Sequence, residues 1–189
     1  MKRYCEGVFG TSITTVNVNY LTKTVEFDGS RITLNLCDTM GTEKFFSISK
    51  NYIRKSDACL FIYDVTSINS FNQIEQWVNE YSESSDKSLS TSCILVGNKS
   101  DVKDEERIVS TQQGKDLAEN YKMEFFECSA LNGDNIDAIF QHAIKLIKSN
   151  SQEKEEEKPK AQENKKQTVD IAPKPAEQTK EKSGCCHLL

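Results

Sequence analysis

The stretch Cys93-Ile-Leu-Val-Gly-Asn98-Lys99-Ser100-Asp101 decides the fold. Its first four residues are apolar, and a short apolar run that ends in turn residues is typical of a strand covered on both faces. A polar loop with an amide, an ammonium and a carboxylate follows the strand. Loops at the carboxyl ends of parallel strands form the ligand crevice of an open α/β sheet. The stretch therefore predicts an α/β protein with a polar site at residues 98–101.

The remaining pattern supports a doubly wound, mostly parallel sheet with helices on both faces. We expect strands at residues 16–27, 31–37, 58–64, 93–96 and 124–128, and Asp28-Gly29 between the first two is a strong hairpin signal. We expect helices at residues 71–81, after the capping box Ser110-Thr-Gln-Gln113 and at residues 136–147. His142 lies off the apolar stripe of the last helix, so it is expected on the solvated surface rather than as a ligand.

Composition divides the chain into a body at residues 1–150 and a tail at residues 151–189. The tail holds all three prolines, no aromatic residue and equal numbers of Lys and acidic residues. It has too little apolar surface to offset the entropy of ordering, so we expect a disordered tether. The formal charge of −5 then belongs to the body. An acidic body without a basic patch excludes nucleic acid as the partner.

Cysteine spacing argues against a metal centre. Five cysteines are scattered singly, no C-x-x-C pair occurs, and the chain has only two His. This pattern excludes a zinc site and predicts free, mostly buried thiols in a reducing compartment. No apolar run approaches the roughly 18 residues of a membrane span, and the N-terminus lacks a signal-peptide core. We therefore expect a cytosolic protein unless lipid holds it to a membrane.

The N-K-x-D spacing of residues 98–101 suits a guanine base. The carboxylate of Asp101 can accept hydrogen bonds from the N1–H and exocyclic amine of guanine, a donor pair that adenine does not offer. Ser129-Ala130 follows the next strand, 28 residues after Asp101, and would supply backbone N–H groups toward the base. Alone, an N-K-x-D sequence can occur in a loop by chance. The two loops together, with Asn98 and Lys99, indicate a guanine-nucleotide site.

A second motif, Asp38-Thr39-Met40-Gly41, fits D-x-x-G. In nucleotide hydrolases an Asp at a strand end holds the water shell of Mg²⁺, and the Gly backbone N–H contacts the γ-phosphate. The hydroxyl of Thr15 could reach the same metal. The simpler alternative is a turn that ends a strand.

Taken together, these segments resemble the Rab-type small GTPases of the Ras superfamily. The resemblance runs over about residues 1–148 and the C-terminus, and it is carried by residues 15–20, 23–29, 38–46, 61–66, 97–101 and 128–130. It implies a small G-protein fold that binds GTP or GDP with Mg²⁺, with Thr15 in switch I and residues 38–55 in switch II. It also implies that Tyr20, Cys37 and Tyr52 form the effector surface.

By the same resemblance, we expect a monomeric switch in intracellular vesicle traffic. Its expected partners are effectors, exchange factors, GTPase-activating proteins and prenylation-escort proteins. Threonine at position 42 replaces the family's catalytic Gln and is too short to orient the attacking water, so we expect slow or absent hydrolysis. Met40, Cys37 and Leu131 also depart from the family pattern, and Cys37 makes the class of effector uncertain.

The largest departure is that no G-x-x-x-x-G-K-[S/T] phosphate loop occurs in the sequence. Residues 1–9 resemble the end of the helix that follows this loop, so the first, central strand of the fold is also missing. Three interpretations compete: an incomplete reading of a longer GTPase gene, a nucleotide-independent pseudo-GTPase that binds partners, and a non-functional truncated product. Loss of a central strand should cost more than the stability of a domain, which favours the first.

The C-terminus predicts lipid attachment. Cys185 and Cys186, near the end of the charged tail, resemble the double geranylgeranylation site of Rab proteins, and residues 186–189 loosely satisfy C-a-a-X. Two lipid chains hold a protein stably on a bilayer, whereas one holds it marginally. The tail has no net positive charge, so lipid would supply the affinity. We expect a protein on the cytoplasmic face of an intracellular membrane that cycles with the cytosol.

Overall fold

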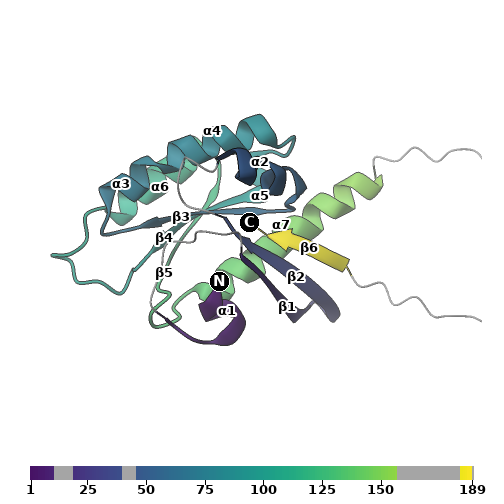
Figure 1. Cartoon of the computed structure of the whole chain (residues 1–189), viewed down its shortest axis with the longest axis horizontal. Helices are drawn as coiled ribbons and strands as arrows, with labels where there is room; N and C mark the ends of the chain where they lie inside the picture. Colours follow the sequence, from purple (N-terminus) through teal and green to yellow (C-terminus); the bar gives the residue numbers. More distant parts are fainter. Residues whose placement is uncertain (11–18, 40–45, 157–183, 189) are drawn as a thin grey trace, which may run out of the picture.

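Two three-stranded sheets form the framework of the molecule (Figure 1). The computed structural model describes residues 1–10, 19–39, 46–156 and 184–188. One sheet has the strand order β1-β2-β6 and the other has the order β3-β4-β5. The strands are β1 (Asn19–Phe27), β2 (Ser30–Asp38), β3 (Cys59–Asp64), β4 (Cys93–Asn98), β5 (Glu124–Cys128) and β6 (Gly184–Leu188). Within the described ranges no ladder joins β2 to β3.

The first sheet is built on the predicted hairpin. Strands β1 and β2 pair antiparallel, from Asn19 opposite Asp38 to Phe27 opposite Ser30. The turn residues Asp28 and Gly29 have φ values of 49° and 70°. Two successive residues with positive φ match the twist of a tight hairpin. The hairpin prediction is therefore confirmed.

The second sheet is wholly parallel and carries helices on both of its faces. The helices are α1 (Lys2–Glu6), α2 (Phe46–Lys55), α3 (Ile68–Asn72), α4 (Ile74–Ser84), α5 (Leu89–Ser92), α6 (Thr111–Asn120) and α7 (Ile136–Glu156). In Figure 1, α3, α4 and α6 lie over one face of this sheet, while α7 crosses behind the other. Two buried clusters correspond to these faces, one including Val78 and Leu117 and the other Ile139 and Ile144. The predicted α/β class is confirmed.

Helix α7 shows one correction to the sequence interpretation. The apolar residues Ile139, Ala143, Ile144 and Ile147 are buried, as their spacing predicts. His142, expected on the solvated surface, is instead half-buried, and its ring lies 5.4 Å from the ring of Phe126. Its Nε2 atom is buried with no hydrogen-bond partner among the described residues. Phe126 of β5 covers the side of α7 on which His142 lies. The helical periodicity of the sequence indicates the apolar face of α7 but not this neighbouring strand.

The structure gives regular backbone to parts of the predicted tail. Helix α7 continues to Glu156, and residues 184–188 form β6, which pairs parallel with β2. These two parts differ from a wholly disordered tether, and residues 157–183 lie outside the described residues. The division into a body at 1–150 and a tail at 151–189 stays a prediction. In the described part of the chain, no helix is both long and apolar enough to cross a bilayer.

The five described cysteines are free thiols. Cys59, Cys93 and Cys128 are buried, while Cys5 and Cys37 are half-buried. Burial raises the pKa of Cys93 to about 12 and that of Cys128 to about 11. Since the thiolate is the reactive form, these thiols are chemically inert. The expectation of free, mostly buried thiols is confirmed for these residues.

Candidate functional site

Three parallel strands end level with one another and so bring their following loops together. The register places Asp64 opposite Asn98, and Asn98 opposite Cys128. The loops that start at residues 65, 99 and 129 therefore leave the sheet at one edge. This edge carries the side chains that the sequence assigned to a base site.

Asn98 links the loop after β4 to the loop after β5 by hydrogen bonds. Its Oδ1 atom accepts a hydrogen bond from the backbone N–H of Ala130 at 3.1 Å. Its backbone carbonyl accepts from the N–H of Val65 at 3.0 Å, and the N–H of Ser100 donates to the carbonyl of Cys128 at 3.0 Å. In this arrangement Asn98 holds the loop after β5 against the loop after β4.

Lys99 connects the site to the end of β3. Its backbone has a φ of 69°, and its Nζ atom lies 2.6 Å from Oδ2 of Asp64. Oδ1 of the same carboxylate accepts from the N–H of Thr66 at 2.9 Å and from its hydroxyl at 2.7 Å. Partial burial alone would raise the pKa of Asp64, but the hydrogen bonds from Lys99 and Thr66 outweigh it and lower the pKa. The Asp64 carboxylate is therefore held ionised.

Asp101 is positioned by a buried hydroxyl. The side chain of Ser129 is fully buried and donates a hydrogen bond to Oδ1 of Asp101. The same hydroxyl oxygen accepts from the N–H of Asn132 at 3.2 Å. Asp101 itself is exposed. The hydroxyl thus fixes one carboxylate oxygen while the residue stays open to solvent, an arrangement suited to receiving N–H donors.

The backbone N–H groups of the second loop have protein acceptors. Ser129 N–H donates to the carbonyl of Asp134 at 3.1 Å, and Ala130 N–H donates to Asn98. The sequence assigned both groups to the base. In the structure they hold the loop in shape, while the side chains of Asp101 and Lys99 stay exposed.

The residues assigned to metal and phosphate are described only in part. Asp38 ends β2 and lines a cavity of about 440 Å³ together with Asn98 and Ala130. Residues of both sheets line the cavity, among them Leu36 of β2 and Leu60 of β3. Among the described residues no cluster of three or more His, Cys, Asp or Glu could hold a metal ion. Thr15, Gly41 and Thr42 lie outside the described residues, so their roles and that of Asp38 stay predictions.

The three residues assigned to the effector surface come together. Tyr20 pairs with Cys37 across the hairpin, and the rings of Tyr20 and Tyr52 meet edge to face with centroids 5.9 Å apart. The hydrogen bond with Tyr52 raises the pKa of Tyr20. The side chain of Tyr20 is 58% exposed, so an aromatic surface is available to a partner.

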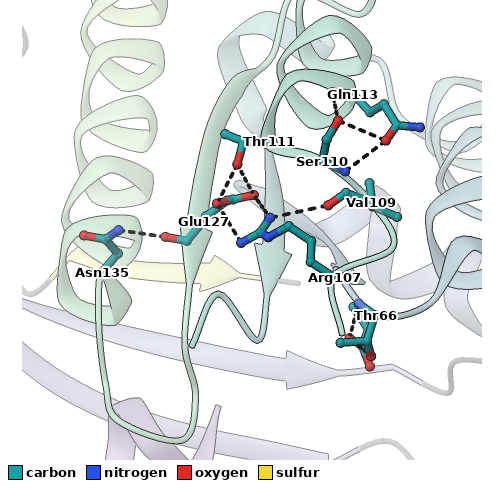
Figure 2. A network of polar contacts seen from close by, with 9 residues as sticks. Thr66, Arg107, Val109, Ser110, Thr111, Gln113, Glu127 and Asn135 are labelled. Atoms are coloured by element: carbon teal, nitrogen blue, oxygen red, sulfur yellow. Dashed lines mark hydrogen bonds and ion pairs between the residues drawn. The ribbon is translucent and has the colours of Figure 1, made fainter. Parts of the chain in front are cut away.

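An ion-pair network behind the site was missed by the sequence analysis. Figure 2 shows Arg107 joined to the carboxylate of Glu127 by two bonds of 2.7 and 3.3 Å, with the Thr111 hydroxyl at 3.1 and 3.2 Å from the same carboxylate. Asn135 Nδ2 donates to the carbonyl of Glu127 at 2.7 Å. Glu127 precedes the Ser129 loop by two residues, so the network anchors the strand from which this loop emerges.

The sequence offered one signal for this network. The capping box predicted at Ser110 and Gln113 is present, which places Thr111 at the first position of α6. Arg107 and Glu127 are 20 positions apart, too far for a local pattern to indicate their contact. The segment of Arg107 is held beside the sheet by Ile108 and Val109, whose N–H groups donate to the carbonyl of Val65, and the pairing of β4 with β5 places Glu127 nearby.

Comparison with known proteins gives concordant results. The family model of the Ras family matches residues 1–149. Ras-related protein RABE1e of Arabidopsis thaliana is 37% identical over 189 residues, covering 99% of this chain and 85% of the relative. Ras-related protein SEC4 of Saccharomyces cerevisiae is 40% identical over 149 residues, covering 77% of this chain and 66% of the relative. Ras-related protein Rab-11B of Dictyostelium discoideum is 37% identical over 148 residues, covering 78% and 66%.

Proposed function

Because the chain belongs to the Rab-type small GTPases of the Ras family, we propose that it is a guanine-specific switch protein of vesicle traffic. The base site consists of the loops at residues 98–101 and 129–130. The observation that carries the proposal is the hydrogen bond from the buried Ser129 hydroxyl to the Asp101 carboxylate. This bond orients an exposed carboxylate at the strand edge where a base would bind. Asp101 then accepts the two N–H donors of guanine.

The other described residues support this role. Asn98 holds the second loop against the first through Ala130. Lys99 stays near Asp64 and extends over the edge of the sheet, where its aliphatic stem could cover one face of the base. Asp38 would carry water ligands of Mg²⁺, which when bound neutralises charge on the β- and γ-phosphate oxygens. Thr15 and Gly41 complete this half of the site in the proposal.

Two departures from the family pattern bear on how tightly this chain binds phosphate and how fast it hydrolyses GTP. The sequence contains no G-x-x-x-x-G-K-[S/T] motif, and Thr42 stands where, by resemblance to the family, a Gln orients the attacking water. We therefore propose that this chain by itself binds nucleotide weakly, and that it hydrolyses GTP slowly even when a phosphate loop is supplied. An activating partner would contribute most of the hydrolytic rate.

Membrane attachment is proposed to use lipid on Cys185 and Cys186. The two cysteines lie near the chain end, in a tail whose Lys and acidic residues are equal in number, so that their charges cancel. Two geranylgeranyl groups would hold the protein on the cytoplasmic face of an intracellular membrane. Escort, exchange-factor and effector proteins would then meet the surface around Tyr20, Cys37 and Tyr52. The protein is proposed to act as a monomer.

A fluorescence titration tests the proposed function. The chain is compared with a version that carries a strand and a G-x-x-x-x-G-K-[S/T] loop ahead of Met1. We expect the extended version to bind GDP and GTP much more tightly than ADP and ATP, and the chain alone to bind all four weakly. If the extended version shows no binding of GDP or GTP in the titration, the proposal fails.

The second candidate function is a nucleotide-independent binding module. The observation that favours it is that Tyr20 of the hairpin and Tyr52 of α2 pack ring to ring while Tyr20 stays exposed to a partner. This function predicts a chain that folds cooperatively and is indifferent to Mg²⁺–GTP. A thermal unfolding curve with and without Mg²⁺–GTP separates the two candidates, because only a nucleotide switch gains stability from its ligand.

A further inference from the structure

Arg3 of α1 joins two segments that are far apart in the sequence. Its Nη1 atom donates to the carbonyl of Gly7 at 3.0 Å, and its Nη2 atom donates to the carbonyl of Asn132 at 2.8 Å. The guanidinium also lies against Gly133, because a Cβ atom at Gly133 would be 3.1 Å from Nη2 and 3.2 Å from Nε. One side chain therefore links the end of α1 to the loop that follows β5.

Helix α1 is held in place by the residue next to Arg3. Tyr4 is buried, and its ring stacks on the ring of Phe140 in α7 with centroids 3.7 Å apart and planes 9° apart. The Nζ atom of Lys23 in β1 lies 3.7 Å from the centroid of the Tyr4 ring. Figure 1 shows α1, in purple, beside α7. Because a packed element carries Arg3, its contact with the loop after β5 can restrain that loop.

The peptide group between Asn132 and Gly133 passes this restraint to the base site. Its carbonyl accepts from Arg3, and its N–H donates to the carbonyl of Ser129 at 2.8 Å. The N–H of Asn132 donates to the Ser129 hydroxyl at 3.2 Å, and this hydroxyl donates to Oδ1 of Asp101. Hydrogen bonds connected in this way polarise and strengthen one another. A continuous series of contacts therefore runs from Arg3 to the carboxylate assigned to the base.

We propose that Arg3 is a positioning residue of the guanine site, which fixes the loop at residues 129–135 and thereby improves the selection of the base by Asp101. The inference rests on the proposed guanine-binding function. Arg3 acts through the loop and not by contact with the nucleotide. When the loop moves, the Ser129 hydroxyl moves with it, and Asp101 loses the orientation that accepts both N–H donors of guanine. Groups that bind a ligand depend on such supporting contacts, because small misplacements weaken directional hydrogen bonds.

Hydrogen exchange of the full chain tests whether Arg3 holds the loop. Arg3→Gln removes the guanidinium, and Lys2→Gln is the matched control because it removes a positive charge from an exposed position of the same helix. We expect Arg3→Gln to speed exchange of the Asn132 and Gly133 amides roughly three- to tenfold, the effect of losing one hydrogen bond. Amides of β4 should keep their rates in both variants. Unchanged loop rates in Arg3→Gln, an equal increase in Lys2→Gln, or an increase that includes β4 would overturn the proposal.

Base discrimination tests the consequence in the version that carries a phosphate loop. Inosine diphosphate lacks the exocyclic amine of guanosine diphosphate, so the ratio of their dissociation constants measures how well Asp101 accepts from this amine. We expect Arg3→Gln to lower this ratio about threefold or more, and Lys2→Gln to leave it unchanged. A general loss of stability would weaken both nucleotides alike, so an unchanged ratio in Arg3→Gln would overturn the proposal. Absence of binding before any substitution would overturn the proposed function, whereas the exchange rates report on Arg3 without nucleotide.

Discussion

The Ser129 hydroxyl is the residue-scale detail on which the shape of the base site depends. It donates to Asp101 and accepts from Asn132 N–H, and it is fully buried. We expect Ser129→Ala to lower the free energy of unfolding by about 1–3 kcal/mol, because it leaves the Asn132 N–H without its acceptor. Urea denaturation measures the effect. Ser149→Ala, which loses an exposed bond to the Lys145 carbonyl, is the control and should change stability by less than about 0.5 kcal/mol.

The carboxylate of Asp64 gives a residue-scale prediction about pH. Its pKa is lowered in the folded state, although burial opposes this, because Lys99 and Thr66 donate to it. Its contribution to stability is therefore present above the unfolded value of about 3.8 and is lost as pH falls through the lower folded value. Because Lys99 is half exposed, we expect this contribution to be at most about 1 kcal/mol.

Urea unfolding of the chain and of Asp64→Asn, measured from neutral to acid pH, checks this prediction. The stability difference between the two proteins should be largest near neutral pH. It should shrink in the acid range as the Asp64 carboxylate becomes protonated. A difference that stays constant to the acid end of the series would show that Asp64 is not held ionised.

At the scale of elements, Glu127 joins β5, α6 and the loop before α6. Its carboxylate meets Arg107 and Thr111, and both side chains of the ion pair are less than one-fifth exposed. We expect Glu127→Ala to destabilise the fold by about 2–3 kcal/mol, because the Arg107 charge would be left partly buried and unpaired. Asp28→Asn, which breaks the exposed pair with Lys148 at 3.8 Å, should cost less than about 0.5 kcal/mol. Equal losses in the two variants would contradict this account.

A second element-scale prediction concerns the approach of α6 to the sheet. A Cβ atom at Gly114 would lie 2.5 Å from Cζ of Phe125 and would overlap the hydroxyl of Tyr63. We expect Gly114→Ala to destabilise the protein by about 1–3 kcal/mol, although alanine favours helices more than glycine does. Gly10→Ala, where a Cβ would meet nothing within 4 Å, is the control. Thermal unfolding of both variants measures the contrast, and a stabilised Gly114→Ala would refute the close approach.

Local patterns predicted most elements because they depend on neighbouring residues. Asp28-Gly29 predicted the hairpin, and Ser110 to Gln113 predicted the start of α6. Contacts between residues far apart in the sequence could not be predicted from local patterns. The Arg107–Glu127 pair, the burial of His142 and the pairing of β6 with β2 all depend on which strands become neighbours.

At the scale of the whole molecule, the sequence predicted that the loops after the strands that end near Asn98 and Cys128 form one polar site. Strand ends at Asp64, Asn98 and Cys128 are level because the parallel register is continuous across three strands. The ends of the apolar runs at residues 93–96 and 124–128 therefore predicted the sheet edge at which the loops of residues 98–101 and 129–130 lie. A C-terminal strand on β2 was not predicted, because the polar composition argued for disorder throughout the tail.

The central claim is that Asp101, held by Ser129, selects a guanine base. Asp101→Asn tests it most directly in the version that carries a phosphate loop. An amide can donate to the C2 carbonyl of xanthine, whereas a carboxylate accepts from the amine of guanine. Competition binding should show that the original residue prefers guanosine diphosphate and that the variant prefers xanthosine diphosphate, each by at least about tenfold. The same preference for guanosine diphosphate in both proteins would contradict the claim.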